Sequence, residues 1–330
     1  MRIDLSGDNL QKMVKAGQIK EFAVGLWNRY SSRVLLNEPL DKYTTYRVGG
    51  PATALCFPGS KEELQDIISS CHRNNIPFFI LGGGSNILVH DNGLNMIVLN
   101  LKECCSEIFL QDKRVYAGAG VLVSDVVCYC EEHNLAGLDF MSGIPGTLGG
   151  ALRMNAGAFV GEIADRVISV ETMLQDGHFL TVTAEEAGFG YRRADNLQDK
   201  IILGCNLKLD TGDRIILEKS RADYLEKRAA KQPLDYGSCG SVFKRPAGGY
   251  AGTLIEKAGC KGMRIGGAMV SPKHANFIIN YKNATASDIF QLIQKVQRIV
   301  YEKFATWLEL EVKLVGFSVQ ERESVKNPAA

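Results

Sequence analysis

DFMSGIPGTLGGALRMNAG, residues Asp139 to Gly157, is the stretch that decides the fold. Its glycines stand at positions 143, 146, 149, 150 and 157. Glycine lets the backbone approach a ligand closely and turn through positive φ at little steric cost. Successive backbone N–H groups in such turns form concave sites for anions, above all for pyrophosphate. The stretch therefore predicts a turn that binds the diphosphate of a cofactor.

A second glycine turn, Gly82-Gly83-Gly84-Ser85-Asn86, follows an apolar run that we expect to be a buried strand, Pro77 to Leu81. It lacks the lysine of a P-loop and the GxGxxG spacing of a dinucleotide-binding βαβ unit. Taken alone, this triple glycine also fits a bare turn. Taken with the first stretch, it predicts two turns that form the two sides of one cofactor site.

The bulk composition is that of an ordinary soluble protein of two or three domains. The 330 residues are 45% hydrophobic and 23% charged, and 38 basic residues balance 37 acidic ones to a formal net charge of +1. Nucleic-acid and membrane-surface proteins usually carry a basic excess. We therefore expect a small-molecule substrate and no nucleic-acid partner. As a separate expectation, which does not rest on the charge balance, we take the protein to be a monomer.

The start of the chain shows neither a secretory signal nor a membrane span, so we expect a cytoplasmic protein outside any membrane. The nine cysteines are odd in number and follow no paired or CxxC spacing, and the five histidines are scattered. This pattern predicts free, mostly buried thiols and no metal site.

Composition shifts divide the chain into four segments. Residues 1–36 have weak helical periodicity (Leu10, Met13, Val14, Phe22 and Leu26) and predict a helical extension. Residues 37–212 hold both glycine turns. A boundary near Asp210–Asp213 separates them from a third segment, 213–318. We expect the polar tail, 319–330, to be disordered.

Several elements can be predicted from local signals. Their order is a helix opened by Ser60 and Glu63, a strand pair over Val115–Val123, a hairpin over Val167–Thr183, a helix over Arg214–Lys231, a helix over Ile289–Trp307 and a strand over Leu308–Leu314. In the last of these, Glu309 and Glu311 are expected on one face.

Three places could carry chemistry. The run Tyr191-Arg192-Arg193 offers guanidinium groups suited to a carboxylate, or is simply a solvated loop. Ser241 lies in an exposed glycine loop without a GxSxG pattern, which favours a proton donor or substrate ligand over a nucleophile. Glu311 lies on a solvated strand face, or its carboxyl is held protonated in a closed cleft and donates to an anionic substrate.

Six motifs occur in a fixed order: LGGGSNILVHDNG, SGIPGTLGGALRMNAGAF, FGYRRA, SCGSVFKRP, KGMRIGGAMVSPKHANFIIN and LELEV. With them the chain resembles the UDP-N-acetylenolpyruvoylglucosamine reductase family (UDP-N-acetylmuramate dehydrogenases), from about Thr44 to Gly316. The short run from Arg192 to Ile202 resembles the second type of the family, which lacks an extra substrate-covering loop.

The resemblance implies an α+β protein. Two subdomains of the p-cresol methylhydroxylase/vanillyl-alcohol-oxidase type hold FAD, and a C-terminal α+β domain binds substrate. By the same resemblance the FAD-binding residues are Thr44, Arg47, Gly82, Gly83, Gly84, Ser85, Asn86, Ser142, Gly143, Ile144, Pro145, Gly146, Gly149, Gly150 and Ala156. The substrate-binding residues are Tyr191, Lys244, Arg245, Lys261, His274 and Asn276.

The resemblance also implies a reaction: NADPH reduces the enolpyruvyl group of UDP-N-acetylglucosamine enolpyruvate through FAD, in peptidoglycan precursor synthesis. Arg192 and Glu311 match positions that stabilise the developing enolate, and Ser241 matches the position that protonates C2. Two alternatives keep a flavin but change the chemistry: an oxidase acting on an alcohol or amine, and a non-enzymatic redox sensor that uses its cysteines.

Overall fold

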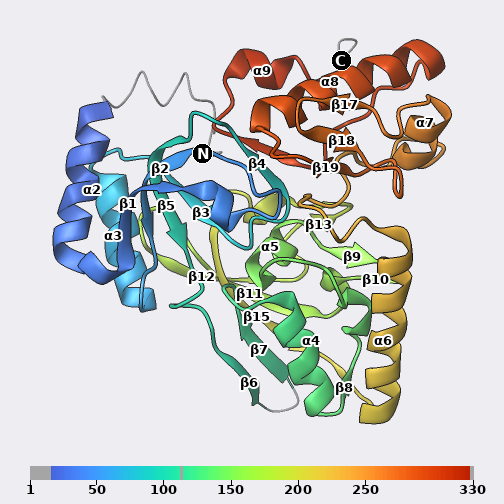
Figure 1. The fold of residues 1–330 in the computed structure, drawn as a ribbon. Helices are drawn as coiled ribbons and strands as arrows, with labels where there is room; N and C mark the ends of the chain where they lie inside the picture. Colours follow the sequence, from blue (N-terminus) through green and yellow to red (C-terminus); the bar gives the residue numbers. More distant parts are fainter. Residues whose placement is uncertain (1–15, 112–113, 328–330) are drawn as a thin grey trace.

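A computed structural model describes residues 16–111 and 114–327, and Figure 1 shows the chain arranged in three units. The first unit is a four-stranded sheet in the order β1-β2-β5-β3. Its strands are β1 (Val34–Pro39), β2 (Pro51–Cys56), β5 (Leu94–Asn100) and β3 (Phe78–Leu81). β1 runs antiparallel to β2, whereas β5 runs parallel to both β2 and β3.

Two helices pack on this sheet, α2 (Ala16–Tyr30) and α3 (Lys61–Arg73). The Ser60 side chain accepts a hydrogen bond from the Glu63 N–H, which confirms the predicted start of α3. Its buried residues are the predicted apolar face: Leu64, Ile67, Ile68 and Cys71.

The N-terminal segment departs from a purely helical extension, since β1 begins at Val34, inside it. Within α2, Leu26 is buried, and Phe22 packs against the core as a partly buried side chain. The other expected periodic residues, Leu10, Met13 and Val14, lie outside the described residues.

The second unit is a five-stranded antiparallel sheet in the order β12-β11-β15-β7-β6. Its strands are β12 (Phe179–Thr183), β11 (Val167–Met173), β15 (Ile201–Lys208), β7 (Arg114–Gly118) and β6 (Ile108–Gln111). The β11–β12 pairing confirms the predicted hairpin. The strand pair predicted over Val115–Val123 is wrong: β7 ends at Gly118 and α4 already begins at Val123, so β7 pairs with β6 and β15 instead.

Helices α4 (Val123–Glu132) and α5 (Leu148–Arg153) pack beside this sheet. Short two-residue strands form three separate pairs. They are β8 (Leu135–Ala136) with β16 (Asp210–Thr211), β9 (Gly157–Ala158) with β10 (Gly161–Glu162), and β13 (Phe189–Gly190) with β14 (Arg193–Ala194). One continuous apolar core, from Ile19 to Leu209, joins the first two units, so they behave as two subdomains of one body.

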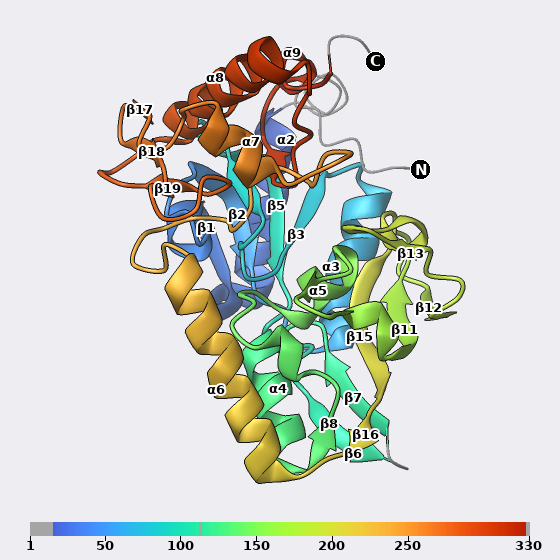
Figure 2. The same cartoon turned by 90° about the vertical axis from the view of Figure 1, so that its right-hand side faces the viewer.

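The third unit has a core of its own. It contains the antiparallel sheet β17-β18-β19, which α8 covers. Its elements are α7 (Ala251–Lys257), β17 (Arg264–Ile265), β18 (Ala268–Val270), β19 (Ile278–Asn280), α8 (Ala286–Phe304) and α9 (Val319–Glu323). Helix α6 (Arg214–Lys231) runs along the second unit and ends beneath the third, as Figures 1 and 2 show.

The third unit returns to the first through β20 (Lys313–Val315), which pairs in parallel with β4 (Ile87–Val89). β4 directly follows the glycine turn Gly82–Asn86. The strand predicted over Leu308–Leu314 is shorter than expected, because β20 begins only at Lys313. Ahead of β20 it keeps only an isolated bridge between Leu310 and Phe243.

The C-terminal tail is ordered as far as residue 327, so the prediction of disorder is wrong there. Ser318 caps α9 in a capping box with Glu321. Two side-chain donors, Gln297 Nε2 and Trp307 Nε1, bind the carbonyl of Val325, which is buried. These contacts hold a sequence whose composition alone resembles a solvated tail.

Among the described residues, we find no helix long and apolar enough to cross a membrane. In the same residues, no group of three or more histidine, cysteine or acidic side chains could hold a metal ion.

Candidate active site

The two glycine turns lie directly against each other. A Cβ on Gly83 would lie 2.5 Å from the Gly146 Cα, so neither position tolerates a side chain without movement. The Ser85 Oγ donates to the Pro145 carbonyl at 3.0 Å across the same contact. This close approach builds a continuous backbone surface from two parts of the chain.

This surface fits a diphosphate. Within the described residues, the backbone N–H groups of Gly83, Gly84 and Ser85 donate no hydrogen bond. In contrast, the N–H groups of Ser142 and Ile144 are satisfied within their own turn. Unpaired backbone donors at a glycine turn favour an anionic ligand. In the same second turn the N–H groups of Gly143 and Gly146 have no partner among the described residues, so both turns offer donors to FAD.

The remaining expected cofactor residues differ in whether their hydrogen-bonding groups are already used within the protein. Gly149 and Ala156 donate their N–H groups to Ala119 and Ala151, which leaves them structural at the backbone level. Thr44 is buried and donates its hydroxyl to the Val48 carbonyl at 2.8 Å. Gly150 is open, because only the Thr147 Oγ1 would lie within 4 Å of a Cβ there.

Arg47 has a left-handed backbone, with φ of 56°. It lines a cavity of about 760 Å³, together with Asp41, Tyr236, Asn280 and Tyr281 among others. This cavity opens between the first and third units rather than on the glycine contact. The structure thus places Arg47 beside the turns and not between them.

Thr45 joins the first glycine turn to the loop that carries Ser241. Its N–H donates to the Gly84 carbonyl at 3.1 Å, and its carbonyl accepts from the Ser238 N–H at 3.1 Å. The loop is held from its other side by Asn276, whose side chain bonds the backbone N–H and carbonyl of Phe243 at 3.1 and 2.8 Å. Asn276 is itself buried, so in the structure it supports the serine loop from within the protein.

Arg192 and Glu311 meet in an ion pair, with 2.8 Å between Arg192 Nε and Glu311 Oε1. Arg192 lies in the two-residue turn between β13 and β14, with φ of 56°. Its Nη2 donates to the Gly157 carbonyl at 3.1 Å. The Nε atom is buried and belongs to the ion pair, so it is not free to bind a further anion.

Glu311 lies next to both the serine loop and the first glycine turn. Its N–H donates to the Val242 carbonyl at 2.8 Å, and its carbonyl accepts from the Asn86 side chain at 3.3 Å. Burial raises the pKa of the Glu311 carboxyl, and the charge of Arg192 opposes this only in part. Arg192, Ser241 and Glu311 thus gather at one place beside the turn Gly82–Asn86.

The expectation that Glu309 and Glu311 share one face is wrong. The Glu311 side chain is 15% exposed, whereas that of Glu309 is 71% exposed and pairs with Lys244 at 3.3 Å. The chain forms only a single bridge here, so the regular alternation of a strand does not hold.

The expected substrate residues are spread around this site. The Tyr191 hydroxyl accepts from the Arg245 N–H at 3.3 Å, which links the arginine turn to the serine loop. Lys261 pairs with Glu256 at 2.7 Å, and neither contacts the Arg192–Glu311 pair. His274 accepts the Asn276 N–H on Nδ1, and burial lowers the pKa of its imidazole.

Lys313 is a candidate that the motifs did not single out. Desolvation and the neighbouring Lys244 lower the pKa of its ammonium, although the residue as a whole is exposed. Its N–H donates to the Asn86 carbonyl at 3.0 Å, next to Glu311. Lys313 follows Glu311 by two residues, and in a strand this spacing places both side chains on one face. That spacing could have identified Lys313 from the sequence.

Comparison with known proteins decides the family. Residues 232–315 match the family model described as UDP-N-acetylenolpyruvoylglucosamine reductase, C-terminal domain, and residues 52–183 match a model described as FAD binding domain. A curated UDP-N-acetylenolpyruvoylglucosamine reductase from Caldanaerobacter subterraneus is 43% identical over 86% of this chain and 94% of its own length. The chain belongs to the UDP-N-acetylenolpyruvoylglucosamine reductase family.

Further relatives agree with this membership. The reductase from Alkaliphilus oremlandii is 44% identical over 86% of this chain and 93% of its own length. The crystal structure of the reductase from Thermus caldophilus superposes with a TM-score of 0.72 at 36% identity, and covers 85% of this chain and 97% of that one. The expected fold class, a flavin-binding body of two subdomains with a C-terminal domain of this reductase family, is confirmed.

Proposed function

We propose that this protein reduces UDP-N-acetylglucosamine enolpyruvate to UDP-N-acetylmuramate with NADPH, through FAD, as a step of peptidoglycan precursor synthesis. The observation that carries the proposal is the meeting of Arg192, Glu311 and the Ser241 loop beside a glycine turn with free backbone donors. The names of the relatives suggest the substrate. The ion pair beside the serine loop supports the assignment of the chemistry to these residues.

FAD, when bound, would supply the chemistry of hydride transfer from NADPH to C3 of the enolpyruvyl group. Negative charge would then develop through C2 onto the substrate carboxylate. We assign the stabilisation of that charge to the Arg192 guanidinium and to Glu311, whose carboxyl pKa is raised by burial. Donors that are fixed before the reaction need no reorganisation as the charge appears.

Ser241 would donate its hydroxyl proton to C2 and complete the saturated lactyl ether. A serine hydroxyl is a weak acid, but the carbanion character at C2 makes this site strongly basic. The loop is fixed from two sides by Thr45 and Asn276, which suits a group that must hold one position. We assign the binding of the substrate diphosphate to Lys244, Arg245 and Lys313, near this loop.

The proposal also covers the setting of the reaction. A nucleotide sugar and NADPH are both metabolites of the cytoplasm, and we place the protein there as a monomer without nucleic-acid or membrane partners. Its near-neutral formal charge of +1 is consistent with that setting.

The deciding experiment separates the two half-reactions under argon. NADPH should bleach the bound flavin, and UDP-N-acetylglucosamine enolpyruvate should then restore its colour with formation of UDP-N-acetylmuramate. Recolouring by air alone, with no response to the sugar nucleotide, would identify an oxidase. A flavoprotein that shows neither turnover nor dependence on the sugar nucleotide would be a sensor.

A further inference from the structure

Arg228, in the last turns of α6, has a buried guanidinium without a counter-charge. The residue is 8% exposed, and in the described part of the chain its Nε and Nη2 have no hydrogen-bond partner. Desolvation lowers the pKa of Arg228, and no acidic neighbour offsets this effect. An unpaired buried charge is strongly unfavourable, so the fold keeps it at a cost to its stability.

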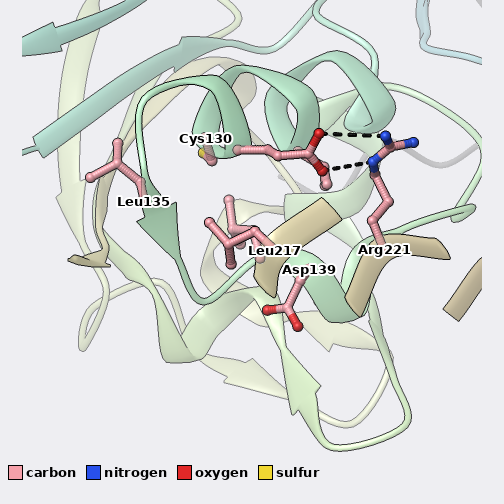
Figure 3. A pocket seen from close by; sticks show the side chains of 8 residues that line it. Cys130, Leu135, Asp139, Leu217 and Arg221 are labelled. Carbon is pink, nitrogen blue, oxygen red and sulfur yellow. Dashed lines mark hydrogen bonds and ion pairs between the residues drawn. The ribbon is translucent and has the colours of Figure 1, made fainter. Parts of the chain in front are cut away.

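A second arginine of the same helix shows the contrast. Arg221 binds the carboxylate of Glu131 through Nε and Nη2, at 2.7 and 3.4 Å. Figure 3 shows this guanidinium beside the small pocket lined by Leu217 and Asp139. α6 thus pairs one arginine with a carboxylate and leaves the other without a counter-charge.

The open guanidinium lies at the second glycine turn. Gly143 has a φ of 75°, and a Cβ there would lie 2.7 Å from Arg228 Cδ and 3.4 Å from its Nε. On another side, the Arg228 Cζ lies 5.5 Å from the centre of the Phe159 ring. Gly143 therefore provides the space in which the arginine stem lies against the turn.

Contacts on both sides of Arg228 fix the helix that carries it. Ser220 Oγ donates to Asp139 Oδ2 at 2.6 Å, which ties α6 to the second unit. Lys273 Nζ donates to the Ala229 carbonyl at 2.5 Å, which ties the end of α6 to the third unit. These contacts fix the part of the helix that carries Arg228 before any ligand arrives, as expected of the support for a binding residue.

We propose that Arg228 binds the diphosphate of FAD at the turn Ser142–Gly146 and supplies the positive charge that the backbone donors lack. The inference rests on the FAD of the proposed function. A diphosphate is the anion that glycine turns of this kind accept, and a guanidinium binds phosphate oxygens in a bidentate manner. Arg228 lies outside both matched family models, because the FAD-binding model ends at residue 183 and the C-terminal model begins at residue 232.

The proposal predicts effects of opposite sign on the two forms of the protein. Arg228→Met removes an unpaired charge from the FAD-free protein, whose melting temperature should rise. The same change removes a charged hydrogen-bond donor from the complex, and the Kd for FAD should increase about 10- to 100-fold. A purely structural arginine would lower the melting temperature of both forms.

The experiment uses the full chain, stripped of flavin and titrated with FAD while the flavin fluorescence and the melting temperature are followed. Arg228→Lys, which keeps the charge, should recover part of the FAD affinity. Arg221→Met is the matched control on the same helix. It should lower the melting temperature with and without FAD and leave the Kd for FAD unchanged.

Three outcomes would overturn the inference. The first is an unchanged Kd for FAD in both Arg228 variants. The second is a FAD-free Arg228→Met protein less stable than the unaltered one. The third is an unchanged Kd for FAD combined with a raised KM for NADPH or the nucleotide sugar, which would assign Arg228 to a substrate diphosphate. Failure of the unaltered protein to bind FAD at all would instead reject the proposed function.

Discussion

Arg192 and Glu311 belong to different units of the fold, yet their side chains form an ion pair with 2.8 Å between Arg192 Nε and Glu311 Oε1. Arg192 lies in a hairpin turn of the second unit, and Glu311 lies in the third unit just before β20. The pairing of β20 with β4 brings Glu311 back to the first unit, beside the glycine turn. The pair therefore depends on all three units being correctly assembled.

Glu311→Gln should raise the melting temperature at pH 7–8. The pKa of Glu311 is raised by burial, so the folded protein holds the proton more tightly than the unfolded chain does. Below the unfolded pKa both states are protonated and the carboxyl has no effect. As the pH rises, ionisation favours the unfolded chain, so the carboxyl then costs stability. Melting curves between pH 4 and 8 would test this.

The stabilisation by glutamine should vanish towards pH 4, and the variant should keep its FAD. A melting temperature lower than that of the unaltered protein at pH 8 would show that the attraction to Arg192 outweighs burial. Loss of the flavin would show that Glu311 is structural.

Ser241→Ala should separate the half-reactions. Bleaching of the flavin by NADPH should proceed at a near-normal rate, because no proton transfer to C2 is involved. Transfer to the enolpyruvyl substrate should slow by about 10²- to 10⁴-fold, the usual contribution of a positioned general acid. Stopped-flow spectroscopy measures both rates. Equal rates of the second half-reaction in the two proteins would remove Ser241 from this role.

Gly83→Ala should abolish or strongly weaken FAD binding, since the new Cβ would lie 2.5 Å from the Gly146 Cα and would push the two turns apart. Gly25→Ala is the control, because nothing lies within 4 Å of a Cβ in that part of α2. Alanine there should stabilise the helix by about 0.5–1 kcal/mol. Flavin content after purification and titration with FAD give the result. Normal flavin content in the Gly83 variant would contradict the assignment of the site.

Asp91→Ala should weaken the attachment of the third unit to the first. Asp91 accepts hydrogen bonds at the start of α8 from the Ala286 N–H, the Ser287 N–H and the Ser287 hydroxyl, at 2.7, 2.9 and 2.6 Å. Its removal should cost about 1–2 kcal/mol, as for the loss of a helix cap. Urea unfolding measures the difference, and Ser287→Ala, which removes one bond of the three, should cost less.

The pH dependence of this effect has a definite sign. Burial acts to raise the pKa of Asp91, but the hydrogen bonds from Ser287 and Ala286 outweigh it and hold the pKa below its ordinary value. The contribution to stability is therefore fully present above the unfolded pKa near 3.9 and is lost as the pH falls through the lower folded value. A difference between the two proteins that grows as the pH falls would contradict this assignment.

Local signals identified most of the elements, because they depend on neighbours in the chain. The cap and apolar face of α3, the hairpin β11–β12 and the long helix α8 each follow from periodicity and turn residues. The failures lie where distant contacts override composition. α9 is ordered because Gln297 and Trp307 bind the Val325 carbonyl, and no local pattern reports that.

The candidate site shows the same division. The motifs named Arg192, Ser241 and Glu311, and their types indicate what each can do. They did not distinguish Glu309 from Glu311, since the alternation of a regular strand is absent there. They also passed over Arg228, which belongs to a charged helix and draws attention only once its burial is known.

The amino-acid sequence by itself determined the family, the glycine turns and the residue types of the site, because these depend on composition and on order along the chain. Only the tertiary structure decided that the two turns touch at Gly83 and Gly146, that the Glu311 carboxyl is buried, and that the Arg228 guanidinium lacks a partner. Whether a side chain is buried and which groups it contacts depend on residues from all three units. The order of residues along the chain does not specify these contacts.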